Sequence, residues 1–344
     1  MAGAPMHDPG RADLHDQYRL PPGELDANAP QQVFILSLSG GGYRGLFSAR
    51  LLARIETDLL GGQPIGDRFD LIAGTSVGGI IATALAHGVT AGAVFAVLKA
   101  QGQLIFPARR FKFARKMLGP ALYRTEPLRA AIHGCLSTAQ TALPLAAVPK
   151  PLLLAAVDWV SAELRLLGSA PTPARDGLGL TVLDAMLATA AAPAHFAPHG
   201  AAGHTFVDGG LAANTPDLLA LQLARQMWAG AEPRLLGVGT ANPLGGGNPQ
   251  AMPQRGFSWA APVIELCMHA QERQASVDCA AALGNHYLRL NRHPSSEQVA
   301  AVQFDTATQS STDILIGLAD QEFDAIQADK ARLGRLLRMM RPAG

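Results

Sequence analysis

The sequence predicts an α/β fold of three layers, in which helices cover both faces of a mainly parallel central sheet. Short continuous apolar runs, typical of strands buried on both faces, alternate along the chain with segments whose apolar residues recur at helical spacing. The first apolar run is followed by a glycine-rich loop that leads directly into such a helical segment. Strand–helix alternation of this kind is typical of a parallel sheet.

The expected elements follow in chain order. Residues 46–60 carry Leu51, Leu52, Ile55 and Leu59 on one face and predict a helix, and residues 77–88 predict another that ends at Gly88. Residues 1–30 lack apolar periodicity and predict a flexible tail, whereas residues 31–344 predict a single domain. The apolar runs predict strands at 33–38, 69–74, 151–157, 163–168, 204–208, 234–240 and 286–291.

Composition excludes several classes of protein. The 344 residues carry a net charge of +1 and only 6% aromatic residues, which argues against a dedicated nucleic-acid binder. Cys135, Cys267 and Cys279 form no C-x-x-C pair and are expected to be buried free thiols of a reducing compartment. The N-terminus does not resemble a signal peptide, and no apolar run reaches membrane-spanning length, so we expect a soluble cytoplasmic protein.

The loop "SGGGYRG" (39–45) allows two interpretations. Gly40, Gly42 and Gly45 fit the G-x-G-x-x-G pattern that binds a dinucleotide pyrophosphate at a helix N-terminus. Three consecutive glycines could instead direct backbone N–H groups at the oxyanion of an acyl transfer reaction. The pattern by itself leaves both interpretations open.

A second motif, "GTSVG" (74–78), has the form G-x-S-x-G between an expected strand and an expected helix. This context is that of a nucleophile elbow, in which a sharp turn holds Ser76 strained with its hydroxyl exposed above the sheet. Gly74 and Gly78 are required there because side chains would collide where the backbone doubles back. The helix that follows directs its positive end toward the reacting centre.

A serine nucleophile needs a base, and the better candidate is an aspartate. Asp208, in "HTFVDGGLAANTP", ends an expected strand before Gly209 and Gly210, so its carboxylate can project into a cleft. Of the ten histidines, three follow the elbow in the order of an α/β-hydrolase triad: His195, His199 and His204. We expect each of them to cap or line a loop, without a neighbouring acid that orients it.

Taken in order, "SGGGYRG", "GTSVGG", "AMLATAAAPAHFAP" and "VDGGLAANTP" resemble the patatin-like phospholipase family over roughly residues 33–291. Many members carry Asp where this chain has Ser39, a departure beside the glycine loop that bears on subfamily rather than on chemistry. The strand after the loop ends in Gly-Thr-Ser rather than in the acid that a dinucleotide fold requires, which settles the loop as an oxyanion hole.

The resemblance implies an ester hydrolase in which Ser76 attacks the carbonyl and Asp208 accepts its proton, then activates water. It places the oxyanion hole at Gly40, Gly41 and Gly42, and it implies neither a metal nor a cofactor. Arg44 is expected to brace the loop or to anchor an anionic head group. The remaining expected supports of the site are Gly45, Gly74, Gly78, Gly209 and Gly210.

The substrate implied is membrane phospholipid, reached by peripheral association with the inner face of the membrane. Two segments suit an anionic surface: residues 104–118, where Arg and Lys alternate with Phe, and residues 330–341, with Arg at every third position. For each segment the alternative is an ordinary solvated surface.

The chain size and the glycine-loop pattern also resemble CapV-type effectors of anti-phage signalling. That resemblance implies activation by a cyclic dinucleotide, at a site that the sequence does not locate. A constitutive lipid-turnover esterase and a catalytically idle lipid- or nucleotide-binding relative stay open as alternatives, as does a homo-oligomer.

Overall fold

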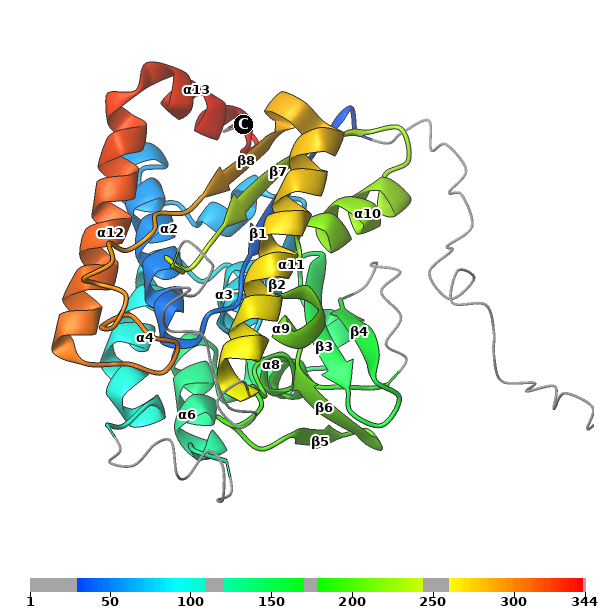
Figure 1. Ribbon diagram of the computed structural model, residues 1–344. Coiled ribbons are helices and arrows are strands. Elements are labelled where there is room, and N and C mark those ends of the chain that lie inside the picture. Colours follow the sequence, from blue (N-terminus) through cyan, green and yellow to red (C-terminus); the bar gives the residue numbers. More distant parts are fainter. Residues whose placement is uncertain (1–29, 109–120, 170–177, 244–259, 343–344) are drawn as a thin grey trace, which may run out of the picture.

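The computed structural model describes residues 30–108, 121–169, 178–243 and 260–342, which form a central sheet between layers of helices (Figure 1). The eight strands of the described residues follow the order β5-β6-β3-β2-β1-β7-β8, with β4 paired to β3. Their bounds are β1 Gln32–Leu38, β2 Leu71–Thr75, β3 Leu152–Asp158, β4 Glu163–Gly168, β5 His199–Ala201, β6 His204–Asp208, β7 Glu232–Val238 and β8 Tyr287–Leu290.

The predicted fold class is confirmed, with one qualification about strand direction. Strands β3, β2, β1, β7 and β8 run parallel, whereas β4 and β6 pair antiparallel with β3, and β5 pairs antiparallel with β6. All seven expected strands are present, and the short β5 was not expected.

Alternation along β1 shows why helices cover both faces of the sheet. Val33 and Ile35 pack on one face with residues of α10 (Asp217–Met227) and α11 (Ala260–Leu283). Phe34, Leu36 and Leu38 pack on the other face with residues of α2 (Gly45–Leu59) and α3 (Val77–Ala86). Because β1 is buried on both faces, every position is apolar except Gln32 at its start and the buried Ser37.

The remaining helices extend these layers (Figure 1). Helices α2 and α12 (Gln309–Ala328) pack side by side, and Arg54 of α2 forms ion pairs with Asp320 and Asp324 of α12. The other bounds are α4 Ala91–Ile105, α6 Thr125–Cys135, α7 Thr138–Thr141, α8 Val182–Thr189, α9 Gly210–Ala213 and α13 Lys330–Arg338. None of the helices in the described residues is long and apolar enough to cross a bilayer.

Of the two segments expected at a membrane surface, the structure describes residues 330–341 in full and residues 104–118 only in part. In α13, Arg332 forms an ion pair with the buried Glu322, and Arg335 donates a 2.5 Å hydrogen bond to the Tyr287 carbonyl oxygen. These arginines therefore hold α13 against the protein. Of the basic segment 104–118, residues 109–118 lie outside the described residues, and Phe106 is buried.

The tail expected at residues 1–30 lies outside the described residues but for its last residue. The three cysteines are free, but only Cys279 is buried, whereas Cys267 is exposed and Cys135 is half-buried. The expectation of three buried thiols is therefore wrong, because α11 presents Cys267 to the surface and Cys279 to the sheet.

Candidate active site

The elbow turns from β2 into α3 at Ser76, whose backbone has φ 56° and ψ −128°. A non-glycine residue with positive φ is strained, and such strain is typical of a serine nucleophile between strand and helix. The side chain was expected to be exposed above the sheet, but Ser76 is only 4% exposed. It lies on the wall of an apolar pocket, which explains the difference.

Two glycines permit the close approach that the elbow needs. A Cβ on Gly74 would overlap the Gly78 carbonyl oxygen, and a Cβ on Gly78 would overlap the Leu38 carbonyl oxygen. The expected collision at both positions is therefore present in the structure. Gly78 also brings the start of α3 against the end of β1, so the elbow and the glycine loop are adjacent.

Thr189, at the end of α8, holds the elbow in place. Its hydroxyl accepts a 3.0 Å hydrogen bond from the Ser76 backbone N–H and donates a 2.5 Å hydrogen bond to the Ala155 carbonyl oxygen of β3. Thr189 lies in the alanine-rich segment that resembles the family, but no pattern in the sequence indicates its role. Only the packing of α8 against β3 shows it.

Asp208 reaches Ser76 because β2 and β6, two of the neighbours of β3, end at adjacent positions of β3. Thr75 of β2 lies opposite Ala155, and Asp208 of β6 lies opposite Ala156. The Ser76 hydroxyl is hydrogen-bonded to the Asp208 carboxylate, and the Gly210 N–H donates to Asp208 Oδ1 at 2.7 Å. The two residues that the sequence proposed as nucleophile and base are thus in direct contact.

Burial sets the proton affinity of this carboxylate. Asp208 is 5% exposed, and desolvation raises its pKa to about 6, against the lowering effect of the hydrogen bonds from Ser76 and Gly210. A carboxylate with this pKa is a stronger base than a free aspartate and still ionised at neutral pH. A Cβ on Gly209 would overlap the Ala155 carbonyl oxygen, so this glycine lets the chain pass close to β3.

The glycine loop offers two backbone donors rather than three. The Gly40 N–H donates a 2.9 Å hydrogen bond to the Asn214 carbonyl oxygen and is therefore unavailable to an oxyanion, which corrects the expectation for Gly40. The N–H groups of Gly41 and Gly42 have no partner within the described part of the chain. Gly42 has φ 58°, and a Cβ there would overlap the Phe304 carbonyl oxygen.

Arg44 braces this loop from inside. Its side chain is 6% exposed, and its Nε donates to the Gly41 carbonyl oxygen at 3.4 Å. Desolvation lowers the pKa of the guanidinium, against the nearby charges of Glu265 and Glu272. Of the two expected roles, the burial favours bracing over contact with a head group. Gly45 follows at the start of α2, where a Cβ would lie 2.5 Å from the Val77 side chain.

Ser39, where many family members carry Asp, joins a buried polar network. Its hydroxyl lies 2.9 Å from the Thr215 hydroxyl and accepts a 2.9 Å hydrogen bond from Arg289 Nη2. Arg289 also forms ion pairs with Asp217 and Glu272, so its charge is neutralised without an acid at position 39. Serine can therefore replace aspartate at position 39, because Asp217 of α10 and Glu272 of α11 supply the negative charges that Arg289 needs.

The three candidate histidines make contacts with residues other than Ser76. His199 Nε2 lies 3.1 Å from Asp184 Oδ1, and His204 Nδ1 lies 2.6 Å from Asp158 Oδ2. The expectation that none has a neighbouring acid is wrong, because the acids come from elements distant in sequence. His195 packs its ring against Phe304. The described residues show no hydrogen bond between Ser76 and any histidine.

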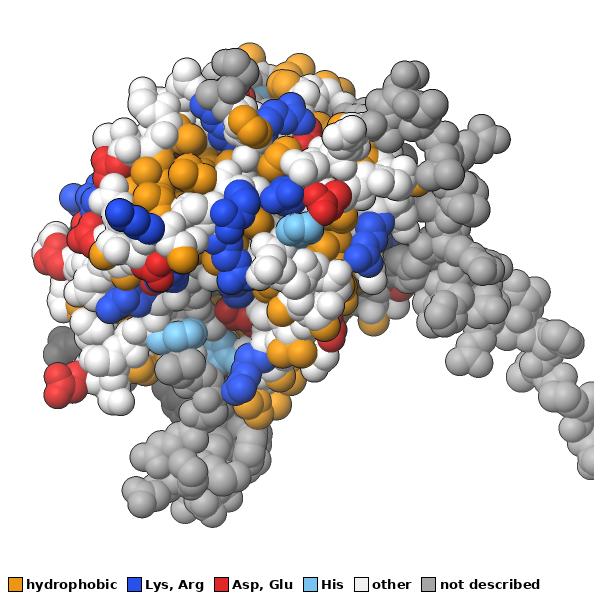
Figure 2. All heavy atoms as spheres, turned by 90° about the horizontal axis from the view of Figure 1, so that it is seen from above, with side chains coloured by type: hydrophobic (Ala, Val, Ile, Leu, Met, Phe, Trp, Pro, Cys, Tyr) orange, Lys and Arg blue, Asp and Glu red, His pale blue; other side chains and the backbone are white. Residues whose placement is uncertain are grey.

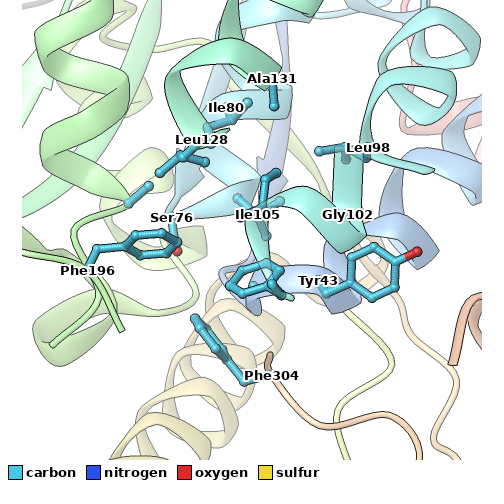
Figure 3. Close-up of a pocket in the computed structure, with 14 residues that line it drawn as sticks. Tyr43, Ser76, Ile80, Leu98, Gly102, Ile105, Leu128, Ala131, Phe196 and Phe304 are labelled. Carbon is cyan, nitrogen blue, oxygen red and sulfur yellow. The ribbon is translucent and has the colours of Figure 1, made fainter. Parts of the chain in front are cut away.

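The pocket beside Ser76 is lined almost entirely by apolar side chains (Figure 3). Its cavity measures about 40 Å³. In the close-up, Ser76 and Phe196 lie on one side of the pocket and Tyr43 on the other, with Phe304 between them. The Tyr43 N–H donates to the Phe304 carbonyl oxygen, and its hydroxyl lies 2.7 Å from that of Thr312. The other lining residues are Gly42, Val77, Ile80, Leu98, Gly102, Ile105, Phe106, Leu128, Ala131 and Ala190.

Comparison with known proteins gives related sequences of stated activity. A cGAMP-activated phospholipase of Pseudomonas aeruginosa is 33% identical over 273 residues, which cover 77% of this chain and 79% of that protein. Proteins of the same name from Vibrio cholerae and Escherichia coli are 39% and 37% identical, but the chain spans only 57% of the length of each.

Among solved structures, VipD from Legionella pneumophila overlaps with a TM-score of 0.38 at 14% identity, over 85% of this chain and 67% of that one. The family model of the patatin-like phospholipases matches residues 36–221, which include the glycine loop, the elbow and Asp208. This chain is a member of the patatin-like phospholipase family.

Proposed function

We propose that the protein hydrolyses ester-linked fatty acids of membrane phospholipids, with Ser76 as nucleophile and Asp208 as the only general base. The observation that carries the proposal is the buried Asp208 carboxylate, with a pKa raised to about 6, hydrogen-bonded to the Ser76 hydroxyl beside an apolar pocket. Family membership supports the reaction class.

In the first half of the reaction, Ser76 Oγ attacks the ester carbonyl carbon while its proton passes to Asp208. The tetrahedral oxyanion accepts hydrogen bonds from the N–H groups of Gly41 and Gly42, and each such donor is worth about 3 kcal/mol in the transition state. When the intermediate collapses, Asp208 returns the proton to the leaving alcohol oxygen, and the acyl group stays on Ser76.

In the second half, Asp208 accepts a proton from water, whose oxygen attacks the acyl carbonyl carbon. Collapse releases the fatty acid, and the proton on Asp208 returns to Ser76 Oγ. The carboxylate therefore serves both steps, which a base of pKa about 6 can do at neutral pH. The apolar pocket is the proposed place of the acyl chain.

We further propose that a cyclic dinucleotide activates this hydrolysis. Its support is the one-third identity to proteins named cGAMP-activated phospholipases. The size of the pocket agrees with a need for activation, since about 40 Å³ is far below the roughly 300–1,000 Å³ of typical ligand sites. A long acyl chain enters only if neighbours such as Phe304 move. The anti-phage role stays a prediction.

The test is release of fatty acid from phospholipid vesicles by the purified protein in the presence of a chelator. The reaction is run alone and with cGAMP, cyclic di-GMP or cyclic di-AMP. We expect release with at least one cyclic dinucleotide, at least tenfold above the basal rate. Equal rates with and without nucleotide would identify a constitutive lipid-turnover enzyme instead. No hydrolysis of any ester would identify a catalytically idle relative.

A further inference from the structure

A second, larger cavity lies where β1 and β7 begin, whereas Ser76 lies beyond the ends of β1 and β2. It measures about 520 Å³, within the usual range for a site that encloses a small ligand. Its walls come from the starts of β1 and β7, the end of α2 and the segment from α13 to Pro342. We call it the arginine cavity after four of its lining residues: Arg68, Arg234, Arg338 and Arg341.

The charges of the arginine cavity are only half neutralised. Arg234 forms an ion pair with Glu232, and Arg341 forms one with Asp70. Arg68 donates to the neutral side chain of Gln63, and Arg338 has no ion-pair partner within the described ranges. Two positive charges are thus left without a counter-charge.

Some guanidinium nitrogens are also left without a hydrogen-bond acceptor. The Nε atoms of Arg68 and Arg234 are buried and have no partner in the part of the chain that the structure describes. Because both Nε atoms are buried, a ligand in the cavity would bind through the other nitrogens of the four guanidinium groups. Phosphate oxygens, like carboxylate oxygens, accept strong and often bidentate hydrogen bonds from guanidinium groups.

Beside the arginines the cavity has an apolar surface. Phe34 and Met340 are buried in its wall, and Leu60 and Leu337 also line it. Figure 2 looks down on the face that carries α13 and shows Lys and Arg side chains beside hydrophobic ones there. A ligand matched to this surface combines negative charge with apolar groups.

We propose that the arginine cavity binds the cyclic dinucleotide activator, a site that rests on the activation proposed above. A cyclic dinucleotide carries two phosphodiester charges, which equal the two uncompensated arginine charges. Its two bases supply flat surfaces for the apolar wall.

Three elements connect the arginine cavity to the glycine loop. Strand β1 starts in the cavity wall at Gln32 and Phe34 and ends at Leu38, directly before that loop. Strand β7 runs beside it, and beyond its end the Thr240 hydroxyl donates to the Gly40 carbonyl oxygen at 3.1 Å. Helix α2 starts at the loop and ends at the cavity.

The C-terminal segment makes a second connection. Phe304 lines the pocket beside Ser76, and Thr312 at the start of α12 contacts the Tyr43 hydroxyl. Helix α12 then leads to α13, whose last turn and following residues line the arginine cavity. A ligand that draws Arg338 and Arg341 inward therefore acts on the same segment that narrows the acyl pocket.

The test is titration calorimetry with cGAMP, cyclic di-GMP and cyclic di-AMP on wild-type protein and on variants. Arg338→Gln removes one exposed, unpaired charge and is expected to raise the Kd of the activating nucleotide at least tenfold. Leu337→Trp fills the cavity without changing its charge and is expected to have a similar effect. Arg225→Gln, on exposed α10 surface outside the cavity, is the matched control and should bind as wild type.

The possible outcomes distinguish failure of the proposed binding site from failure of the proposed activation. If wild type binds none of the three nucleotides, the proposed activation fails and the site with it. If wild type binds one and both cavity variants bind it equally well, activation stands and the cavity is the wrong place. Competition by vesicles of phosphatidylglycerol would assign the cavity to a lipid phosphate and overturn the proposal. Nucleotide-dependent protection of residues 330–338 from amide exchange would support it independently.

Discussion

The Asp208 carboxylate is hydrogen-bonded to the Ser76 hydroxyl while its Oδ1 accepts a 2.7 Å hydrogen bond from the Gly210 N–H. Both bonds favour the ionised carboxylate, but burial disfavours it more strongly, and the pKa rises to about 6. The same two donors fix the orientation of the carboxylate. The hydrogen bonds therefore orient the proposed base, whereas its raised basicity comes from burial.

The pH dependence of hydrolysis should report this pKa. Only the ionised carboxylate accepts the Ser76 proton, so kcat/KM should fall about tenfold per pH unit below about pH 6 and level off above it. An ordinary aspartate, with a pKa of about 3.9, would keep the rate constant down to about pH 5. The measurement is kcat/KM for a short activated ester from pH 4.5 to 8.5. A constant rate between pH 5 and 7 would contradict the raised pKa.

Asp208→Asn should lower turnover by at least ~10²-fold, the usual contribution of a general base. The amide keeps the shape of the carboxylate but cannot accept the Ser76 proton. A fluorophosphonate probe should also label Ser76 much more slowly in this variant, because acylation needs the same base. Labelling at the wild-type rate together with lost turnover would limit Asp208 to deacylation.

The same variant should be more stable than wild type at neutral pH. Because folding raises the pKa of Asp208 from 3.8 to about 6, the ionised form is disfavoured in the folded state, and stability falls as pH rises through this window. The full penalty, on the order of 3 kcal/mol, applies above pH 6 and is absent near pH 3.8. Thermal unfolding at pH 8 and pH 4 should show a Tm gain of Asp208→Asn only at pH 8. An equal Tm difference at both values would show that the substitution acts through packing.

Thr189→Val should lower kcat about tenfold while leaving KM nearly unchanged. Valine has the shape of threonine but leaves the Ser76 N–H without an acceptor and frees the elbow from β3. Thr189→Ser restores the hydroxyl and should recover most of the rate, which a merely structural role of the methyl group would not explain. If the valine variant kept the wild-type kcat, the elbow would hold its geometry without Thr189.

Replacing the histidines one at a time by alanine should leave at least half of the activity, in contrast to Ser76→Ala, which should abolish it. His204→Ala leaves the buried Asp158 without its ring partner and should lower Tm without lowering kcat. The readouts are ester hydrolysis and thermal unfolding of each variant beside Ser76→Ala. Loss of rate in a folded His195→Ala, His199→Ala or His204→Ala to the level of Ser76→Ala would establish a conventional triad.

Local sequence patterns predicted seven of the strands and the glycine motifs, and they indicated Ser76 and Asp208 as the proposed nucleophile and base. Apolar runs marked β1 and β2 because burial on both faces requires it, and Gly74 and Gly78 marked the elbow because no other residue fits the backbone approach. Each of these features depends on only a few consecutive residues, so it can be predicted from the local sequence.

The tertiary structure alone decided how these pieces meet. The antiparallel pairing of β6 with β3 brings Asp208 to Ser76. The Gly40 N–H donates its hydrogen bond to the Asn214 carbonyl oxygen, and Thr189, at the end of α8, accepts one from the Ser76 N–H. The arginine cavity likewise gathers side chains from residues 32–342. Such contacts leave no periodic trace in the sequence, because a hydrogen bond or an ion pair between distant elements depends on their packing and not on their spacing along the chain.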